Sequence, residues 1–222
     1  MSTSSIGLDE ALQQYLLDVS LHEAEACRLL REQTLTMSDA NMISSPEQVQ
    51  LLLLLFKMLD ARNGLEIGTF TGYTSLCLSL GMPRLKMTCC DVSEEFTSIA
   101  RQHWQQADVA ERIDLQLAPA QQTLDGLIDE GFEGAYDFAY IDADKSGYRN
   151  YVDACLVLVR PGGLITLDNV LWSGSVIDPE DTSEDTVALR KLNLWIHEQA
   201  PGRYDLSLIP IGDGLTVMRK NC

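Results

Sequence analysis

Leu65-Glu66-Ile67-Gly68-Thr69-Phe70-Thr71-Gly72-Tyr73-Thr74-Ser75 is the stretch that decides the fold. An apolar, β-prone run ends in an acidic residue and two glycines four apart, and a helical pattern follows over residues 74–80. This order predicts a strand, a tight loop and the start of a helix. In an open parallel sheet, such a loop lies at the carboxyl end of the first strand, where ligands bind and glycine lets the backbone approach them closely.

The loop favours a ligand other than a dinucleotide. Its order of Glu66, Gly68 and Gly72 differs from the Gly-x-Gly-x-x-Gly pattern that cradles a pyrophosphate. The acidic residue indicates a ligand that offers hydrogen-bond donors, such as an ammonium group or ribose hydroxyls. S-adenosylmethionine carries both groups. Taken alone, the same loop would also serve as a plain chain reversal.

Strand and helix patterns alternate from Leu65 onward, which predicts a doubly wound, Rossmann-like α/β sheet. The closing runs 205–209 and 214–219 are too close for a parallel crossover, so we expect them to form an antiparallel hairpin. Pro161-Gly162-Gly163 is expected to stop the helix that precedes the fifth strand. The prediction is therefore seven strands, mostly parallel. Besides the hairpin, the first strand begins at Leu65, and four more cover residues 85–90, 113–117, 136–141 and 164–167.

Residues 9–33 carry two helical patterns ahead of the sheet. We interpret residues 1–40 as a helical add-on that packs on the sheet, covers the site or forms a subunit contact. Residues 41–222 are expected to form the catalytic core of a single domain, 1–222. Within it, Ser45-Pro46-Glu47-Gln48 predicts a helix start, in which Ser45 is the N-cap and Gln48 closes a capping box.

Charge and composition exclude some classes of protein. A formal net charge of −17 would repel a polyanion over much of the surface, so nucleic-acid binding is not expected. No membrane association is expected, because the apolar run 51–55 is far shorter than the ~20 residues of a spanning helix. Residues 1–9 show no signal-peptide pattern. Six scattered cysteines indicate free thiols in a reducing cytoplasm: Cys27, Cys77, Cys89, Cys90, Cys155 and Cys222.

Acidic residues end four of the predicted strands: Glu66, Asp91, Asp142 and Asp168. Because ligands bind outside the carboxyl ends of parallel strands, we expect these side chains to converge on one cleft. Any single one of them could instead cap the following helix. Asp91, 25 residues after Glu66, stands where nucleoside-binding sheets hold a ribose diol.

Asp142, Asp168 and Asn169 offer hard oxygen ligands, which suit Mg²⁺, with Mn²⁺ or Ca²⁺ as alternatives, better than zinc. A cation with open coordination positions can bind the hydroxyls of a substrate and lower their pKa. Lys145 could then accept the proton as a general base. The alternative is a surface lysine paired with Asp142 or Asp144.

Four motifs in unbroken order resemble the caffeoyl-CoA and catechol O-methyltransferase-like family. These enzymes are metal-dependent class I methyltransferases that use S-adenosylmethionine. The resemblance runs from about Met42 to the C-terminus. Its motifs are the stretch 65–74, Tyr140-Ile141-Asp142-Ala143-Asp144-Lys145, Asp168-Asn169-Val170-Leu171-Trp172-Ser173-Gly174-Ser175-Val176 and Gly212-Asp213-Gly214.

The resemblance implies a role for each matching residue. Lys145 is similar to the family's general base, with Asp142 beside it. The implied metal ligands are Asp142, Asp168 and Asn169, and Trp172, Ser173 and Tyr148 are expected at the acceptor pocket. Plant members carry an Asn at the position of Ser173, so their acyl-CoA acceptor is not assumed here. Contacts to S-adenosylmethionine are implied for Met42, Ser44, Glu66, Gly68, Thr69, Thr74, Asp91, Ala120, Asp142 and Asp144.

The resulting hypothesis is a cytoplasmic O-methyltransferase that acts on vicinal hydroxyls of a small, catechol-like aromatic acceptor. The family resemblance also implies a homodimer. Two alternatives stay open. One is methylation of a hydroxyuridine in tRNA, against which the acidic surface counts. The other is a noncatalytic cofactor-binding module, against which the intact set of Asp142, Lys145, Asp168 and Asn169 counts.

Overall fold

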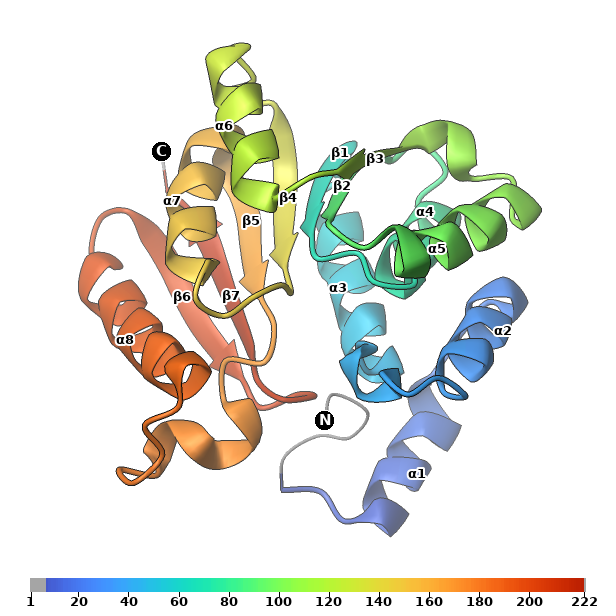
Figure 1. Ribbon diagram of the computed structural model, residues 1–222, viewed down its shortest axis with the longest axis horizontal. Helices are drawn as coiled ribbons and strands as arrows, with labels where there is room; N and C mark the ends of the chain where they lie inside the picture. The colour runs from blue at the N-terminus through green and yellow to red at the C-terminus, as the bar shows by residue number, and fades with distance from the viewer. Residues whose placement is uncertain (1–6, 222) are drawn as a thin grey trace.

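The computed structural model describes residues 7–221, so the expectations for the start of the chain and for Cys222 fall partly or wholly outside the described residues (Figure 1). In this part, seven strands form one sheet in the order β3-β2-β1-β4-β5-β7-β6. Neighbouring strands from β3 to β5 are parallel, and β7 is antiparallel to both β5 and β6. The predicted Rossmann-like sheet with its closing hairpin is confirmed. The strands are β1 (Asn63–Ile67), β2 (Lys86–Asp91), β3 (Ile113–Leu117), β4 (Tyr136–Ile141), β5 (Val159–Leu167), β6 (Tyr204–Ile209) and β7 (Leu215–Lys220).

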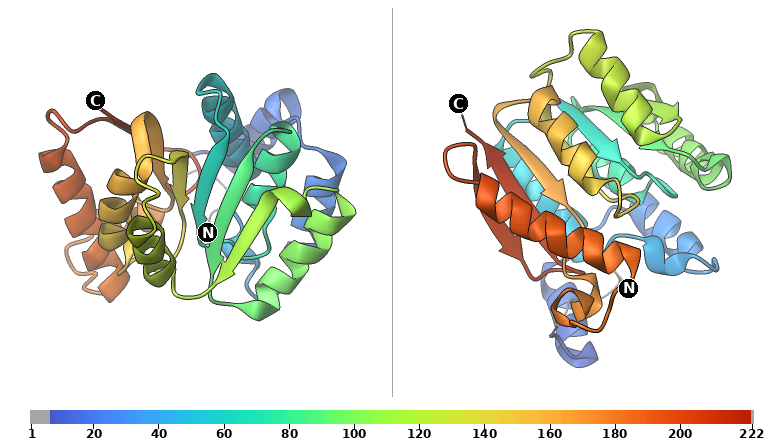
Figure 2. Two further views of the ribbon diagram at one scale, coloured as in Figure 1. Left: turned by 90° about the horizontal axis from the view of Figure 1, so that it is seen from above. Right: turned by 60° about the vertical axis from the view of Figure 1, so that its left-hand side comes forward.

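Helices cover both faces of the sheet (Figure 2). On one face lie α3 (Pro46–Met58), α4 (Tyr73–Gly81) and α5 (Glu94–Gln106), and on the other α6 (Ala120–Asp129), α7 (Tyr148–Leu158) and α8 (Glu184–Gln199). Each face has its own apolar cluster, because successive side chains of a strand point to opposite faces. Short 3₁₀ turns are η1 (Ala40–Met42), η2 (Ala110–Arg112) and η3 (Trp172–Ile177). Across residues 7–221, no helix combines the length and apolar character that a membrane crossing requires.

The loop after β1 is pressed against the loop after β4. Gly68 has φ +89°, and a Cβ atom there would lie 1.8 Å from the carbonyl oxygen of Asp142. The N–H of Asp142 donates to the carbonyl of Ile67 at 2.7 Å, and the N–H of Gly68 donates to that of Cys90 at 2.9 Å. Only glycine fits this contact, which joins the ends of three strands.

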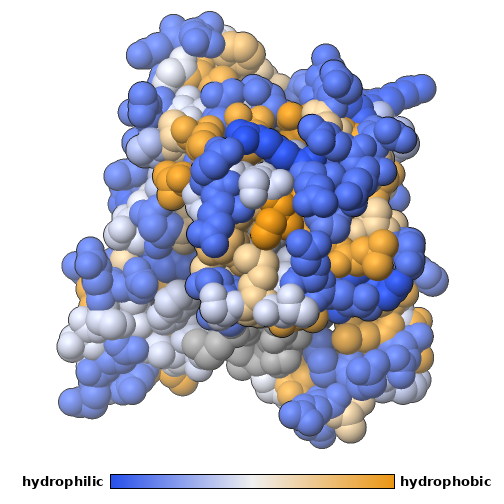
Figure 3. Space-filling view, turned by 45° about the vertical axis from the view of Figure 1, so that its right-hand side comes forward, coloured by the Kyte–Doolittle hydropathy of each residue, from blue (hydrophilic) through white to orange (hydrophobic). Residues whose placement is uncertain are grey.

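The N-terminal helices differ in how they are held. Helix α2 (Glu25–Thr34) packs against α4, and its Thr34 hydroxyl donates to that of Thr71 at 2.9 Å. Helix α1 (Glu10–Ser20) buries only Gln13, and Leu12, Tyr15 and Val19 are exposed. In Figure 3, which brings the right-hand side of Figure 1 forward, hydrophobic residues form separate orange groups on a largely blue surface.

Two local predictions are wrong. Helix α7 ends at Leu158, before Pro161, and β5 already begins at Val159. The pairing with β4 shifts register there, so that residues 160–163 form a bulge opposite Asp137, where Gly163 allows the two strands to approach closely. Ser45 is the N-cap residue of α3 but makes no side-chain cap, and Gln48 turns away to Asp168 instead of closing a capping box. By contrast, the N-cap residue of α5, Ser93, does form a side-chain cap, because its hydroxyl oxygen accepts from the N–H of Phe96.

Replacing Gly68 by alanine is expected to unfold or strongly destabilise the protein. The matched control is Gly131→Ala, because Gly131 has φ +84° but nothing within 4 Å of the added Cβ. The control should lose only the conformational term of about 1–2 kcal/mol. Gly68→Ala adds a backbone collision, so its unfolding free energy in urea should fall by clearly more. Equal losses for the two variants would contradict the close contact with Asp142.

Candidate active site

A cavity of about 710 Å³ opens at the carboxyl ends of the parallel strands. This main cavity is formed by residues 41–44, by the loops that follow β1 to β5, and by Asp213. It lies at the point where the strand order reverses between β1 and β4, the usual ligand position in such sheets. Its size suits a ligand of nucleoside dimensions. Of the predicted site residues, its walls include Met42, Ser44, Gly68, Thr69, Thr74, Asp91, Ala120, Asp142, Asp144, Lys145, Asn169 and Trp172.

Two of the loops around the cavity contain left-handed backbone at residues other than glycine. Phe70 has φ +52° in the loop after β1, and Asn169, Trp172 and Ser173 have φ between +48° and +57° after β5. Such conformations cost on the order of 1–3 kcal/mol each and tend to occur where function requires a particular geometry. In this chain they direct the ends of β1 and β5 toward the cavity.

Asp91 holds the glycine loop in place from the end of β2. One carboxylate oxygen, Oδ2, accepts hydrogen bonds from the N–H groups of Thr69 at 2.9 Å and Phe70 at 2.8 Å, and Oδ1 accepts from Ser93 N–H at 2.8 Å. Asp91 also lines the main cavity. The contact of Asp91 with a ribose stays a prediction. The structure shows in addition that Asp91 holds the glycine loop through hydrogen bonds to its backbone.

Glu66 lies beneath the glycine loop and is not among the residues that line the main cavity. It is 1% exposed, and its Oε2 atom has no hydrogen-bond partner among the described residues. Burial raises the pKa of Glu66 to about 8, against nearby donors that lower it. The expected convergence of four acids on one cleft is therefore wrong for Glu66. Asp168 is fully buried and does not line the main cavity either, whereas Asp91 and Asp142 do.

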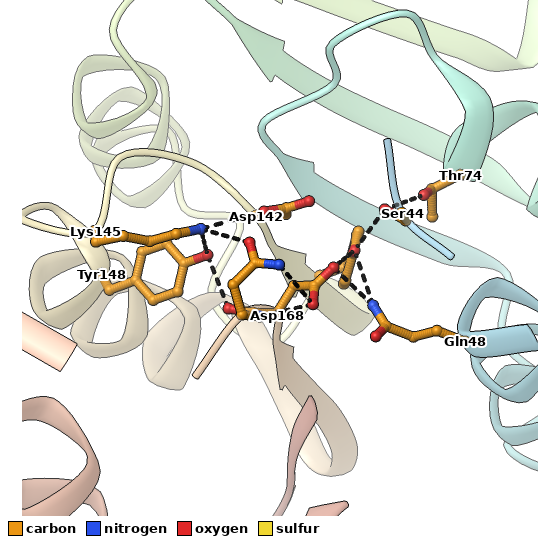
Figure 4. A network of polar contacts seen from close by, with 9 residues as sticks. Ser44, Gln48, Thr74, Asp142, Lys145, Tyr148 and Asp168 are labelled. Atoms are coloured by element: carbon orange, nitrogen blue, oxygen red, sulfur yellow. Dashed lines mark hydrogen bonds and ion pairs between the residues drawn. The ribbon is translucent and has the colours of Figure 1, made fainter. Parts of the chain in front are cut away.

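Lys145 is the centre of a polar cluster on the β4 and β5 side of the cavity (Figure 4). The side chain is 7% exposed, and Nζ donates to Tyr148 Oη at 2.6 Å, Asn169 Oδ1 at 2.8 Å and Asp142 Oδ1 at 3.3 Å. Nζ also lies 5.5 Å from the ring centroid of Trp172. The ammonium group thus joins the ends of β4 and β5.

Asp168 is fully buried and receives hydrogen bonds at both oxygens. Oδ2 accepts from Tyr140 Oη at 2.6 Å and Gln48 Nε2 at 2.7 Å, and Oδ1 accepts from the N–H of Asn169 at 2.6 Å. Burial and the charge of Asp142 raise the pKa of Asp168 to about 7. Burial also raises the pKa of Tyr140 well above its ordinary value, so its hydroxyl remains a donor to the carboxylate.

The side-chain oxygens of Asp142, Asp168 and Asn169, here called the oxygen cluster, fit a hard divalent cation. One ammonium group contacts Asp142 Oδ1 and Asn169 Oδ1 together, so these oxygens are close enough to share one cation. The neighbouring Asp168 carboxylate has no direct ion pair with any residue of 7–221, and a cation there would offset its burial. Within residues 7–221, no three His, Cys, Asp or Glu side chains gather as a metal site. The candidate set is instead two carboxylates and the amide of Asn169.

Two of the residues predicted at the acceptor pocket lie elsewhere. Tyr148 is fully buried, and its hydroxyl supports Lys145 and donates to the carbonyl of Asp168 at 3.1 Å, so a direct contact with an acceptor does not fit. Ser173 is exposed, and its N–H donates to Asp213 Oδ1 at 2.5 Å. Trp172 does line the main cavity.

The sequence interpretation missed three of the site's contacts. The sequence pattern assigns Gln48 to a capping box, and it includes Tyr140 and Asp213 only as members of motifs. The signal for Asp213 was its position between two glycines, both with positive φ in the structure. No short-range signal exists for Gln48, because its partner lies 120 residues away.

A seven-stranded sheet of this order, with an antiparallel β7 and a ligand cavity at the switch point, defines a Rossmann-like methyltransferase fold. The model of the O-methyltransferase family matches residues 17–221. The mouse catechol O-methyltransferase domain-containing protein 1 is 40% identical over 96% of this chain and 80% of its own length. The caffeoyl-CoA O-methyltransferase of Eucalyptus gunnii is 37% identical over 95% and 88%. The crystal structure of an SAH-bound methyltransferase from Podospora anserina has a TM-score of 0.85 and 27% identity, and the match covers 99% of both chains. The chain belongs to the O-methyltransferase family.

Glu66→Gln is expected to flatten the dependence of stability on pH. Because the folded-state pKa of about 8 lies above the ordinary value of 4.5, the folded protein holds a proton that the unfolded chain loses in this window. The wild-type unfolding free energy should therefore fall as the pH rises from 5.5 to 8.5, with Glu66 contributing on the order of 1–3 kcal/mol of that loss. Urea titrations across this range would measure it. The same slope in both proteins would contradict the buried acid.

Proposed function

We propose that this protein transfers the methyl group of S-adenosylmethionine to a hydroxyl of a small, catechol-like aromatic acceptor with the help of a divalent cation. The observation that carries the proposal is that one cavity is lined both by the glycine loop after β1 and by Asp142, Lys145 and Asn169. The glycine loop suits the cofactor, and the residues around Lys145 suit the acceptor. Family membership and the names of the relatives support the same reaction class.

The cofactor would lie along the loops after β1, β2 and β3. Gly68, Thr69, Ser44 and Thr74 line the cavity and would hold its amino acid part. Asp91 would accept hydrogen bonds from the ribose hydroxyls. Apolar side chains, Phe70, Phe96, Pro119 and Ala120, line the part of the cavity that would hold the adenine. Phe70 and Phe96 pack edge to face at 4.7 Å between ring centroids.

Asp142, Asp168 and Asn169 would hold the cation, Mg²⁺ for preference. S-adenosylmethionine supplies an activated methyl group, and the cation supplies positive charge that favours ionisation of an acceptor hydroxyl. Lys145 lies within reach of both Asp142 and Asn169, and as the neutral amine it would take the proton from that hydroxyl. Trp172 would form an apolar wall for the aromatic ring.

Alignment is the main contribution expected of the protein itself. The rigid ends of β1, β4 and β5 fix the residues that hold donor and acceptor, and well-oriented reactants gain about 7–11 kcal/mol. Asp144 helps to fix the loop after β4, since it accepts hydrogen bonds from Tyr151 Oη at 2.6 Å and the N–H of Gly147 at 2.9 Å. We also propose that Asp144 contacts the cofactor, because it lines the main cavity.

The acidic character of the chain favours an acceptor without phosphates. Among the described residues of the main cavity, Lys145 is the one cationic side chain, and it is already held by three oxygens. The net charge of −17 adds a general repulsion of polyanions. We therefore place tRNA and coenzyme A thioesters below free catechols as acceptors.

The setting of the enzyme is also part of the proposal. The described cysteines are free thiols, which supports work in a reducing compartment, the cytoplasm. A homodimer is proposed because α1 exposes Leu12, Tyr15 and Val19. In this arrangement residues 1–40 are the add-on and the remainder is the catalytic core of one domain.

Methyl transfer from labelled S-adenosylmethionine should require a divalent cation and Asp168. The assay would compare free catechols, a catechol coenzyme A thioester and tRNA, each with Mg²⁺ and with EDTA. Asp168→Asn keeps the side-chain size but removes the charge, and Asp205→Ala, at an exposed acid on β6, is the control. We expect EDTA and Asp168→Asn to abolish transfer to catechols. Full activity in EDTA would contradict the proposed role of the cation.

Lys145→Ala should lower turnover by about 10²-fold or more, because general-base catalysis contributes 10²–10⁴-fold. Binding of SAH, measured by calorimetry, should change little, since the proposed cofactor contacts lie mainly on the other loops. Lys86→Ala, at an exposed lysine on β2, serves as the control. If Lys145→Ala weakened SAH binding as much as turnover, the assignment as base would be wrong.

A further inference from the structure

The amide of Gln48 and the hydroxyl of Tyr140 meet at one oxygen of the fully buried Asp168, and Figure 4 labels Gln48 and Asp168 in this network. The amide of Gln48 comes from the first turn of α3, and the hydroxyl of Tyr140 from β4. Both donate to Oδ2, at 2.7 Å and 2.6 Å. Gln48 is 0% and Tyr140 1% exposed, so neither contact competes with water. Together they fix the position of this carboxylate oxygen.

Ser44 and Thr74 extend the hydrogen bond of Tyr140 into a chain whose donors all run in the direction of Asp168. Because the Tyr140 hydroxyl has one proton and donates it to Asp168, the contact of 2.9 Å with Ser44 requires Ser44 to be the donor. Thr74 donates in turn to Ser44 at 3.3 Å. A chain of hydrogen bonds in one direction strengthens each of its members. It runs from the wall of the main cavity to Asp168.

Two polar atoms at the start of α3 lack hydrogen bonds within residues 7–221, in the structure that places Gln48 beside Asp168. Gln48 does not complete the capping box, and its own Oε1 atom is buried without a hydrogen-bond partner among the described residues. The Oγ atom of Ser45 is in the same condition. An unsatisfied buried polar atom destabilises the folded state. Such departures from good local structure are expected where a functional site requires them.

We propose that Gln48 and Tyr140 are positioning residues for the divalent cation. They hold Oδ2 of Asp168, so that Oδ1, on the side of Asn169, is the oxygen presented to the cation. The inference rests on the proposed function, in which Asp142, Asp168 and Asn169 bind that cation. Groups that orient metal ligands in this way typically change metal affinity by about 10–100-fold when removed.

The test is calorimetric titration of the full chain with Mn²⁺ alone, without cofactor or acceptor. Tyr140→Phe removes one hydroxyl, and Gln48→Leu removes the amide. The matched controls are Tyr136→Phe, whose hydroxyl contacts Thr88 at 3.0 Å, and Gln50→Leu on the same helix, whose amide donates to the Ser20 carbonyl at 2.7 Å. Unfolding in EDTA is measured for every variant.

We expect Tyr140→Phe and Gln48→Leu to weaken Mn²⁺ binding by about 10–100-fold, while both controls bind as wild type does. Turnover of Tyr140→Phe should recover as Mg²⁺ is raised, which a purely structural role would not produce. Wild-type Mn²⁺ affinity in both site variants would overturn the inference and leave the proposed function standing. Weaker binding that only follows a loss of stability in EDTA would also overturn it. No Mn²⁺ binding by the wild type would overturn both.

Discussion

The site depends on the contact between the loop after β1 and the loop after β4. Gly68 lies so close to the carbonyl of Asp142 that no side chain fits there, and the N–H of Asp142 donates a hydrogen bond to the carbonyl of Ile67. This contact fixes the cavity wall made by the glycine loop relative to the first residue of the oxygen cluster. The distance between the two halves of the site is therefore set by backbone atoms, which move less than side chains.

A second constraint is the burial of charge at the end of β5. In the described part of the chain Asp168 has no direct salt bridge, and its charge is compensated by hydrogen bonds from Tyr140, Gln48 and the backbone of Asn169. Partial compensation of this kind leaves the carboxylate with a raised pKa and favours a cation nearby. The site therefore combines a rigid frame with a local need for positive charge, which Lys145 supplies in part.

The pattern of strands, helices and strand-end acids was predictable because it depends on residues close together in the chain. Strands β3 and β4 begin and end where the sequence predicted. The errors have a different origin. The bulge in β5 depends on the pairing with β4 on either side of Asp137, and the true role of Gln48 depends on Asp168, both distant in sequence. The burial of Glu66 and Tyr148 also follows from packing, which a strand-end pattern does not contain.

The most direct measurement is a crystal structure with Mn²⁺ and SAH, with data collected at a wavelength where manganese scatters anomalously. The account predicts one anomalous peak beside Asp142, Asp168 and Asn169, with Lys145 moved away from its contact with Asp142. SAH should lie along Gly68, Thr69 and Asp91. A structure with SAH in the cavity, Lys145 still joining Asp142 and Asn169, and no peak at these oxygens would contradict it.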